Sequence, residues 1–502
     1  MVVPLPEALL VIAGLAVAGV ASLRWLRVAQ REHYLAPAVS RFAWRWWVSS
    51  PINLALSLTG LATIVLSFWE PAWGWLALTI LLYGPWGLSL RGVSSPLVWT
   101  QRLRRLAGVL AGLVGVAALL AWMFRPVLIG VTCLALPILT DLALILLGPI
   151  ERRLGQPWVE QAKARLLSSG ARVVAITGSY GKTSTKTYIA HLLTGWRQSV
   201  ATPASFNNRL GLARAINENM GPGTEVFVAE MGTYGPSEIG TLCEFVKPDI
   251  ALITAIGPVH LERFKSVEAI TAAKREILEN APVAVLNIDH PELRMVADEE
   301  QALRKVVTVS TSDPTAGVAV IEGHLWLDGV EVARVGEEVF ASNLAMAVAA
   351  ANQLGMPIEH LKSRLNDIPP TPHRRQLITS GNGFAIIDDT YNSNPAGAEA
   401  ALADLAVLAL RGRRVVVTPG MVELGRRQQA DNRAFAAKAS QVATDLIVVG
   451  RTNRRALIEG ARGGQASVTV LPSRSAAVEW VRSQLGPGDA VLYENDLPDH
   501  YP

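Results

Sequence analysis

A glycine-rich loop with one lysine and several hydroxyl residues follows a short apolar run at 173–177. Glycines let backbone N–H groups turn toward a phosphate, the following helix N-terminus adds positive potential, and a lysine adds a full charge. A threonine after that lysine is placed to bind Mg²⁺. The spacing is the compact G-x-x-G-K-T form, and it predicts a nucleotide site. Its expected binding residues are Gly178, Ser179, Gly181, Lys182, Thr183 and Ser184.

A carboxylate, an imidazole and an amine follow this loop in the chain. Glu230 ends an apolar run, His260 follows the next run, and Lys274 lies in a helical segment. Parallel sheets place functional groups at the carboxyl ends of their strands. Each residue alone also has a structural interpretation, because a single histidine is often structural and Lys274 can be a solvated helical residue. Their order after the loop indicates functional groups gathered at the carboxyl ends of the strands.

Short β-branched runs alternate with helical segments through the last two thirds of the chain, which predicts parallel sheets with crossover helices. A proline cluster at 369–372 predicts a break between a middle domain, 151–370, and a last domain, 371–502. The predicted strands lie at 172–177, 226–230, 250–255, 284–287, 384–388, 414–418, 445–449 and 490–493.

The composition separates the first 150 residues from the rest. Half of the 502 residues are hydrophobic and only 18% are charged. Residues 1–150 hold ten arginines, no lysine and four acidic residues, whereas the remainder is almost neutral. A nucleic-acid partner is therefore not expected, because it needs a basic face on the globular part. Cys133 and Cys243 lie in different regions, which excludes a disulfide framework.

The first 150 residues are predicted to form a membrane domain of about five helices, each near the ~20 residues that cross a bilayer. The basic segments 24–50 and 89–105 predict cytoplasmic loops, an external N-terminus and catalytic domains in the cytoplasm. Asp141, inside the fifth stretch, marks either a polar substrate groove or a helix-packing contact. The apolar stretches run at about 5–23, 53–69, 72–88, 106–124 and 127–150.

These motifs resemble those of the Mur ligases, the ATP-dependent amide-forming enzymes of peptidoglycan synthesis. The loop at 177–184 is similar to their phosphate loop, and Asn207 and Asn208 resemble the loop that comes next. The run 388–395, DDTYNSNP, is close to a signature of the branch that adds D-alanyl-D-alanine. Glu423-Leu424-Gly425 resembles another part of that branch. The likeness covers roughly residues 165–495.

The resemblance implies that a substrate carboxylate is activated by ATP as an acyl phosphate, which an amine then attacks. It implies two Mg²⁺ ions and carbamylation of Lys274. The implied catalytic residues are Lys182, Lys274, His260 and Arg374, with Arg375 as the alternative arginine. The nucleotide contacts outside the loop are Asn287, Arg374 and Asp389. The metal ligands are Thr183, Glu230, His260 and Lys274, and the substrate contacts are Asn207, Asn208, Asn392 and Asn394. Asn287 is almost as well explained as a residue that turns the chain after a strand.

Three departures from the family pattern stand out. Membrane segments take the place of the soluble domain that grips the UDP part of the substrate. Val339 and Phe340 occupy the positions of a His-Asn pair, ahead of Asn343. The last strand ends Tyr493-Glu494-Asn495 where the branch has Lys-Gly-Ser. Carboxylates at that edge either change the amine substrate or form a plain polar tail.

The sequence therefore predicts a multi-pass helical membrane domain, 1–150, followed by an α/β P-loop domain and a Rossmann-like C-terminal domain. The expected function is a Mur-type ligase at the cytoplasmic membrane. Its expected partners are the lipid bilayer, a lipid-linked or membrane-proximal carboxylate, an amino acid or peptide amine, and other membrane proteins. The alternatives are a ligase that builds a poly-γ-glutamate-like polymer, an ATPase that energises transport through the helices, and a non-catalytic scaffold.

Overall fold

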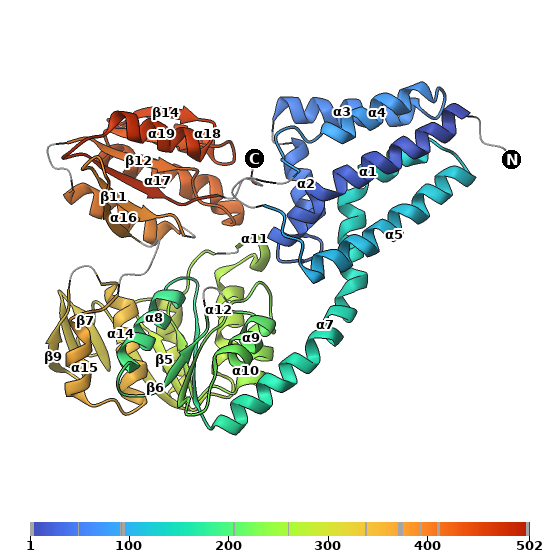
Figure 1. Cartoon of the computed structure of the whole chain (residues 1–502). Helices are drawn as coiled ribbons and strands as arrows, with labels where there is room; N and C mark the ends of the chain where they lie inside the picture. Colours follow the sequence, from blue (N-terminus) through green and yellow to red (C-terminus); the bar gives the residue numbers. More distant parts are fainter. Residues whose placement is uncertain are drawn as a thin grey trace. The chain divides into compact units, whose positions relative to one another are not determined.

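The computed structural model divides the chain into two compact units (Figure 1). The helical unit comprises Met1–Leu154 with the short segments Gly450–Arg454 and Asp496–Pro502, and the α/β unit comprises Gly155–Val449 and Arg455–Asn495. The structure describes residues 5–48, 50–90, 92, 96–203, 206–259, 261–336, 339–369, 375–391, 394–408, 412–497 and 501. The predicted boundary at 370/371 lies outside these residues.

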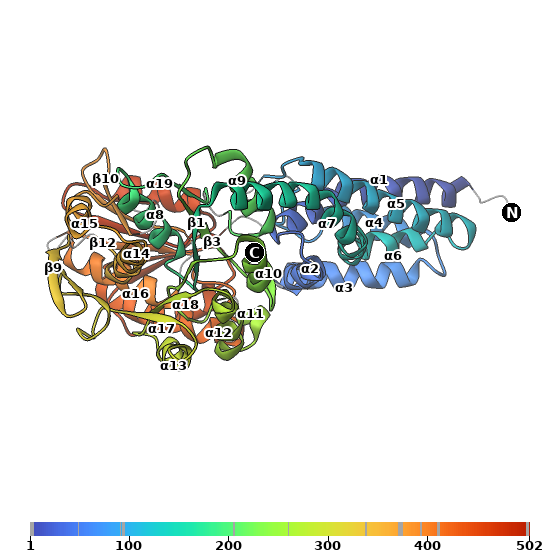
Figure 2. The same ribbon diagram turned by 90° about the horizontal axis from the view of Figure 1, so that it is seen from below.

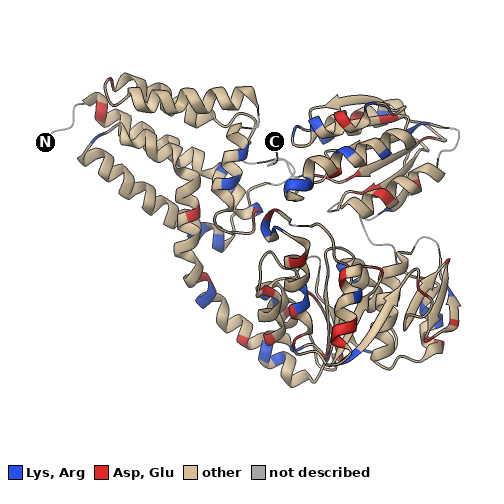
Figure 3. Ribbon diagram, turned by 180° about the vertical axis from the view of Figure 1, so that it is seen from behind, with Lys and Arg blue, Asp and Glu red and all other residues tan. Residues whose placement is uncertain are grey.

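The helical unit is built from apolar helices whose packed faces form one hydrophobic core. Figure 3 shows that α3 and α4 are almost free of charged residues. The helices are α1 (Leu5–Arg31), α2 (Ala38–Val48), α3 (Pro51–Leu66), α4 (Ala72–Tyr83), α5 (Gln101–Met123), α6 (Leu128–Leu134) and α7 (Leu136–Ser169), of which α7 continues into the α/β unit.

The described helices do not reproduce five uniform spans. By length and composition, α1 and α5 could each cross a membrane, and up to four spans result if each bent pair, α2 with α3 and α6 with α7, is one span. The α4 helix has only 12 residues. The interval 24–50 is also not a loop, because α1 continues to Arg31 and α2 follows. Arg24 is buried in α1 and donates hydrogen bonds to the carbonyl oxygens of Gly84 and Leu88, just after α4.

Asp141 has a structural partner within the helical unit. Its carboxylate accepts hydrogen bonds from the backbone N–H groups of Val39 (3.2 Å) and Ser40 (2.8 Å), and from the Ser40 hydroxyl. These N–H groups belong to the first turn of α2, where a helix leaves its donors unsatisfied and favours negative charge. Asp141 is 5% exposed, and it therefore fastens α7 to the start of α2. The helix-packing interpretation fits this geometry.

The first sheet of the α/β unit has nine strands in the order β2-β3-β1-β4-β5-β6-β7-β8-β9. The strands from β2 to β7 are parallel, and β8 and β9 are antiparallel additions. The strands are β1 (Arg172–Thr177), β2 (Ser199–Ala201), β3 (Val226–Glu230), β4 (Ile250–Ile253), β5 (Val283–Asn287), β6 (Lys305–Ser310), β7 (Val318–Ile321), β8 (His324–Leu327) and β9 (Val330–Arg334).

Helices cover both faces of this sheet (Figure 2). One core joins the sheet to α8, α14 and α15, and the other joins it to the end of α7 and to α9, α10 and α13. The helices are α8 (Lys182–Leu193), α9 (Arg209–Asn219), α10 (Glu238–Val246), α11 (Leu261–Phe264), α12 (Val267–Arg275), η1 (Glu276–Leu278), α13 (Pro291–Glu300), α14 (Ala341–Gln353) and α15 (Ile358–Leu365).

The second sheet has six strands in the order β10-β11-β15-β12-β13-β14, parallel except for β10. All eight predicted strands are present within about two residues, but both sheets are mixed rather than parallel. The strands are β10 (Gln376–Thr379), β11 (Ala385–Asp389), β12 (Arg414–Thr418), β13 (Asp445–Val449), β14 (Ser467–Leu471) and β15 (Ala490–Glu494). The helices are α16 (Pro395–Val407), η2 (Gly425–Arg427), α17 (Gln428–Val442), α18 (Arg454–Ala461) and α19 (Arg474–Gln484).

The contact between Asp141 and α2 gives a test of the helical unit. Replacing Asp141 with alanine leaves three donors without their acceptor, which costs about 1–3 kcal/mol for a buried site. We expect a lower melting temperature in detergent, measured by size-exclusion chromatography of heated samples. Asp141→Asn keeps an acceptor oxygen and should lose less. A melting temperature unchanged in both variants would show that the carboxylate does not hold α2.

Candidate active site

The glycine-rich loop joins the end of β1 to the start of α8. Gly181 has φ +84 and is the residue before the first turn of α8. A Cβ at Gly181 would meet Oδ1 of Asn343, and the left-handed backbone conformation at this position also disfavours a side chain. Asn343 on α14 thus lies against the loop, although the family's His-Asn pair is absent just before that helix. The apolar Val339 and Phe340 pack instead against the core beneath it.

Ser179 and Lys182 stabilise the shape of the loop. The Ser179 hydroxyl donates to the carbonyl oxygen of Gly257 (3.1 Å) and accepts from the Gly257 N–H (3.0 Å). The Lys182 Nζ donates to the carbonyl oxygen of Gly178 at 2.7 Å. By contrast, the buried hydroxyl oxygens of Ser184 and Thr185 have no hydrogen-bond partner among the described residues. Such orphaned groups at a helix N-terminus fit a phosphate, which would satisfy them.

Glu230, the last residue of β3, is buried beside this loop. Its Oε2 accepts a hydrogen bond from the Thr183 hydroxyl (3.2 Å) and forms an ion pair with Lys186 Nζ (2.9 Å). The sequence interpretation overlooked Lys186. Its position was visible, because it is four residues after Lys182 and on the same side of α8. Thr183 and Glu230 together supply the hard oxygen donors that Mg²⁺ prefers, so this pair fits the metal ligands expected from the sequence.

Lys274 brings a third lysine to the site from α12. It is 4% exposed. Burial lowers the pKa of the Lys274 amine well below its usual value, and the charge of Lys182 lowers it further. The amine is therefore close enough to Lys182 to be repelled by it, and it is disposed to be neutral. A neutral amine is nucleophilic, whereas an ammonium is not.

Asn287, at the end of β5, is occupied within the protein. Its side-chain amide donates to the carbonyl oxygen of Thr254 (3.1 Å), and its Oδ1 accepts from the N–H of Asp289 (3.1 Å). This arrangement fits a residue that turns the chain and connects two strand ends. Nearby, the rings of Tyr180 and His290 lie 6.0 Å apart between centroids, on the loop and just beyond Asn287. Burial lowers the pKa of His290.

Two of the predicted substrate asparagines begin helices. The Asn208 side chain accepts from the N–H of Gly211 (2.9 Å) at the start of α9, and Asn394 accepts from the N–H of Gly397 (3.0 Å) at the start of α16. Asn207 lies against the loop after β3, where its carbonyl oxygen accepts from the Gly232 N–H (2.8 Å). His260, Arg374 and Asn392 are also predicted site residues, and they lie outside the described part of the chain.

The second sheet carries Asp389 at the end of β11. Its Oδ1 accepts from the N–H of Arg375 (3.2 Å). The Arg375 guanidinium itself is held by the carboxylate of Asp404 through two hydrogen bonds. Arg375, the alternative to Arg374 in the sequence interpretation, therefore has its charge paired with Asp404.

The last strand corrects one interpretation of the sequence. Glu494 does not present a carboxylate to a substrate, because it is fully buried and accepts a hydrogen bond from the Thr418 hydroxyl. Asn495 donates to the carbonyl oxygen of Gly420 (2.7 Å). Both side chains connect the ends of β15 and β12. Glu494 and Asn495, which replace residues of the family pattern, therefore make internal hydrogen bonds that hold these two strands together.

No group of three or more histidine, cysteine, aspartate or glutamate side chains within the described ranges could hold a metal ion. This finding does not cover the ligand set expected here, which includes a threonine and a lysine and extends to His260. Three members of that set are described: Thr183 and Glu230 are joined by a hydrogen bond, and Lys274 is buried on α12.

Comparison with known proteins identifies both α/β parts. Residues 176–354 match the Mur ligase middle domain, and residues 373–493 match the Mur ligase glutamate ligase domain. The UDP-N-acetylmuramoyl-tripeptide–D-alanyl-D-alanine ligase of Mycobacterium bovis is 32% identical over 370 residues, covering 66% of this chain and 71% of that enzyme. The enzyme of that name from Bacillus subtilis is 29% identical, covering 66% and 75%. The MurF ligase of Thermotoga maritima in complex with ADP has the same fold, with a TM-score of 0.59, 24% identity and coverage of 68% and 80%.

The buried pair between Lys186 and Glu230 predicts a large effect on stability. Lys186→Met leaves the Glu230 carboxylate buried without its cation, which costs about 3–5 kcal/mol. We expect a clearly lower melting temperature, measured by differential scanning fluorimetry of the purified protein. The matched control is Lys362→Met, which removes an exposed pair with Glu359 and should cost no more than about 1 kcal/mol. Equal effects of the two substitutions would contradict the assignment of a buried pair.

Proposed function

The chain belongs to the Mur ligase family, whose members are ATP- and Mg²⁺-dependent amide ligases, and we propose that it joins a carboxylate to an amine in peptidoglycan precursor synthesis at the cytoplasmic membrane. The observation that carries this proposal is a group of three lysines at the loop, in which Lys186 pairs with the buried Glu230 and Lys182 lies close enough to the buried Lys274 to lower its pKa. This excess of positive charge suits a polyphosphate.

In this proposal an oxygen of the substrate carboxylate attacks the γ-phosphorus of ATP. The bond from that phosphorus to the β-phosphate oxygen breaks, and ADP leaves. The nitrogen of the amine then attacks the acyl carbon, the amide bond forms, phosphate departs, and the amine gives its extra proton to water. Lys182 and the N–H groups of the loop would balance the charge on the transferring phosphate, and Arg374 would add a further positive charge.

The residues proposed to hold Mg²⁺ are Thr183 and Glu230 for one ion, and His260 and Lys274 for a second. Bound Mg²⁺ would neutralise charge on the phosphates. Lys274 is proposed to act as a carbamate, in which its amine nitrogen has bonded to the carbon of CO₂ and lost a proton. The lowered pKa of Lys274 supports this step, because only the neutral amine reacts. The product is an anion that complements the neighbouring lysines.

Substrate identity is proposed from the curated relatives and from the helical unit. The relatives are named for joining D-alanyl-D-alanine to a UDP-linked tripeptide, and we propose an amino acid or peptide amine of this class. The apolar helices support a lipid-linked or membrane-proximal carboxylate, because attachment to the same bilayer raises the effective concentration of both partners. Asn207, Asn208, Asn392 and Asn394 are proposed to contact these substrates, and Asn287 and Asp389 the nucleotide.

The proposed domains are a membrane domain at 1–150, a middle domain at 151–370 and a C-terminal domain at 371–502. The parallel order of β11, β15, β12, β13 and β14 supports a Rossmann-like C-terminal domain. The basic segments 24–50 and 89–105 support catalytic domains in the cytoplasm. The proposed external N-terminus requires an odd number of spans, which is reached when the short helix α4 is counted as the fifth.

The test of function uses detergent-purified protein with Mg-ATP. Phosphate release is measured against a panel of amino acids, D-alanyl-D-alanine, and soluble or lipid-linked wall precursors, and product masses are recorded. We expect a new amide mass that needs both an amine and a carboxylate acceptor, and its absence in Lys182→Ala. An amide formed with lipid-linked acceptors alone would support the membrane-held substrate. Phosphate release that no amine or acceptor changes would reject the ligase proposal.

Lys274→Met separates stability from activity. Methionine removes the cost of burying an amine, so we expect the free protein to become more stable near neutral pH while amide formation is lost. The amine of Lys274 binds its proton less tightly in the folded state than in the unfolded chain. Wild-type stability should therefore rise with pH between the lowered value and the usual 10.5.

The melting temperature is measured across this pH range in CO₂-free buffer. The phosphate and product assay is run separately on wild type and variant in buffer that contains bicarbonate. The variant should lack the part of the pH slope that comes from Lys274. A variant that is less stable than wild type, or that still forms the amide, would contradict the role given to this lysine.

A further inference from the structure

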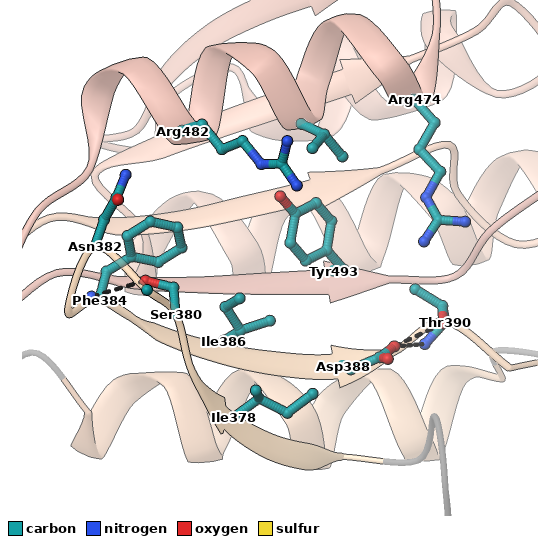
Figure 4. Close-up of a pocket in the computed structure, with 12 residues that line it drawn as sticks. Ile378, Ser380, Asn382, Phe384, Ile386, Asp388, Thr390, Arg474, Arg482 and Tyr493 are labelled. Carbon is teal, nitrogen blue, oxygen red and sulfur yellow. Dashed lines mark hydrogen bonds between the residues drawn. The ribbon is translucent and has the colours of Figure 1, made fainter.

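The C-terminal domain has a cavity on the face of its sheet that most of its helices do not cover. Among the described helices, α16, α17 and α18 pack against one face of the six-stranded sheet, whereas α19 packs against the other. Beside α19, the strands β10, β11 and β15 form the floor of a cavity of about 430 Å³ (Figure 4).

The floor of this cavity is apolar at one end and polar at the other. Ile378 of β10 lies opposite Ile386 of β11, and Asp388 of β11 lies opposite Tyr493 of β15. Residues two apart in a strand share a face, so Phe384, Ile386 and Asp388 all line the cavity. Ile378 is 40% exposed, which leaves apolar surface open to a ligand.

The wall on the side of α19 carries two arginines. Figure 4 shows the Arg482 guanidinium next to the Tyr493 hydroxyl, and the Arg474 guanidinium nearer to Thr390. Burial raises the pKa of Tyr493, and the charges of Arg474 and Arg482 oppose part of this rise, so both act on the same hydroxyl. The Asp388 carboxylate accepts hydrogen bonds from the N–H (3.2 Å) and hydroxyl (2.6 Å) of Thr390. The lining is therefore net positive.

The cavity is separate from the edge assigned to the nucleotide. Asp388 and Asp389 are neighbours in β11, so their side chains point to opposite faces of the sheet. Asp388 lines the cavity, whereas Asp389 is 8% exposed and accepts from the N–H of Arg375. Asp388 and Thr390 belong to the run 388–395, but no described residue that the resemblance gives a catalytic, metal, nucleotide or substrate role lines the cavity.

We propose that this cavity binds a short acidic peptide, with one carboxylate on Arg482 and Tyr493, a second on Arg474, and an apolar side chain on Ile378 and Ile386. The two arginines are eight residues apart, which places their Cα atoms about 12 Å apart along α19. An extended peptide of about four residues spans this distance at ~3.3 Å per residue. A single phosphate or a lipid headgroup would use only one end of the site and leave the apolar floor between the arginines empty.

The test measures binding to the full-length protein in detergent, without ATP, by fluorescence anisotropy of two labelled peptides. One is an acetylated tetrapeptide amide with glutamate at each end and two central alanines, and the other has glutamine in place of both glutamates. We expect the acidic peptide to bind at least about tenfold more tightly, since each charge-assisted hydrogen bond contributes strongly. Since ATP is absent, this result does not depend on the proposed ligase activity.

Arg482→Ala and Arg474→Ala should each weaken binding of the acidic peptide by about tenfold, and Arg482→Lys should lose less. The matched control is Arg462→Ala, an exposed arginine of the same domain outside the cavity, which should bind as the wild type does. Both cavity arginines are exposed, so these variants should fold, and their melting temperatures verify this.

Three results would overturn the proposal. The first is equal binding of the acidic and neutral peptides, and the second is an equal loss in the Arg462→Ala control. The third is complete displacement of the peptide by inorganic phosphate or by phosphatidylglycerol micelles at similar concentrations, since this would indicate a site for a single anion.

Discussion

The active site is organised around an imbalance of buried charge. Lys186 of α8 and Lys274 of α12 are buried, Lys182 lies at the start of α8, and the buried carboxylate at the end of β3 pairs with Lys186. Burying a charge is tolerated only when it is paired or neutralised. Both conditions are met here. Lys186 is paired with Glu230, and burial favours the neutral form of Lys274. The remaining positive charge of Lys182 lies at the helix N-terminus, where an anionic ligand would complete the balance.

The sheet order explains why this site forms where it does. β1 is flanked by β3 and β4, so the loop after β1 meets the end of each neighbour. Ser179 connects the loop to the segment after β4, and Thr183 connects it to the end of β3. These contacts fix the loop before any ligand binds, so little ordering entropy remains to be lost when a ligand enters.

The sequence was informative where local pattern and chemistry coincide. Apolar β-branched runs located eight strands, and Gly181 with Lys182 marked the turn into α8, because these features depend on nearby residues. Partners distant in sequence were not predictable. Asp141 meets the start of α2 about one hundred positions earlier, and Glu494 is buried against Thr418. The charge of each residue was evident, but whether it faces solvent, substrate or another helix depends on packing. Hydropathy likewise did not show the bend between α6 and α7, which interrupts one continuous apolar stretch of the sequence.

The alternation of side chains along β11 has a consequence for how this domain can change. Asp388 and Asp389 are adjacent in sequence, so their side chains lie on opposite faces of the sheet. The register of β11 with β10 and β15 determines which face each side chain lies on. Insertion or deletion of one residue in this strand would exchange the two faces at once. We therefore expect β11 to keep its length even at positions where a substitution is tolerated. One face of the sheet can then change only by replacement of its side chains.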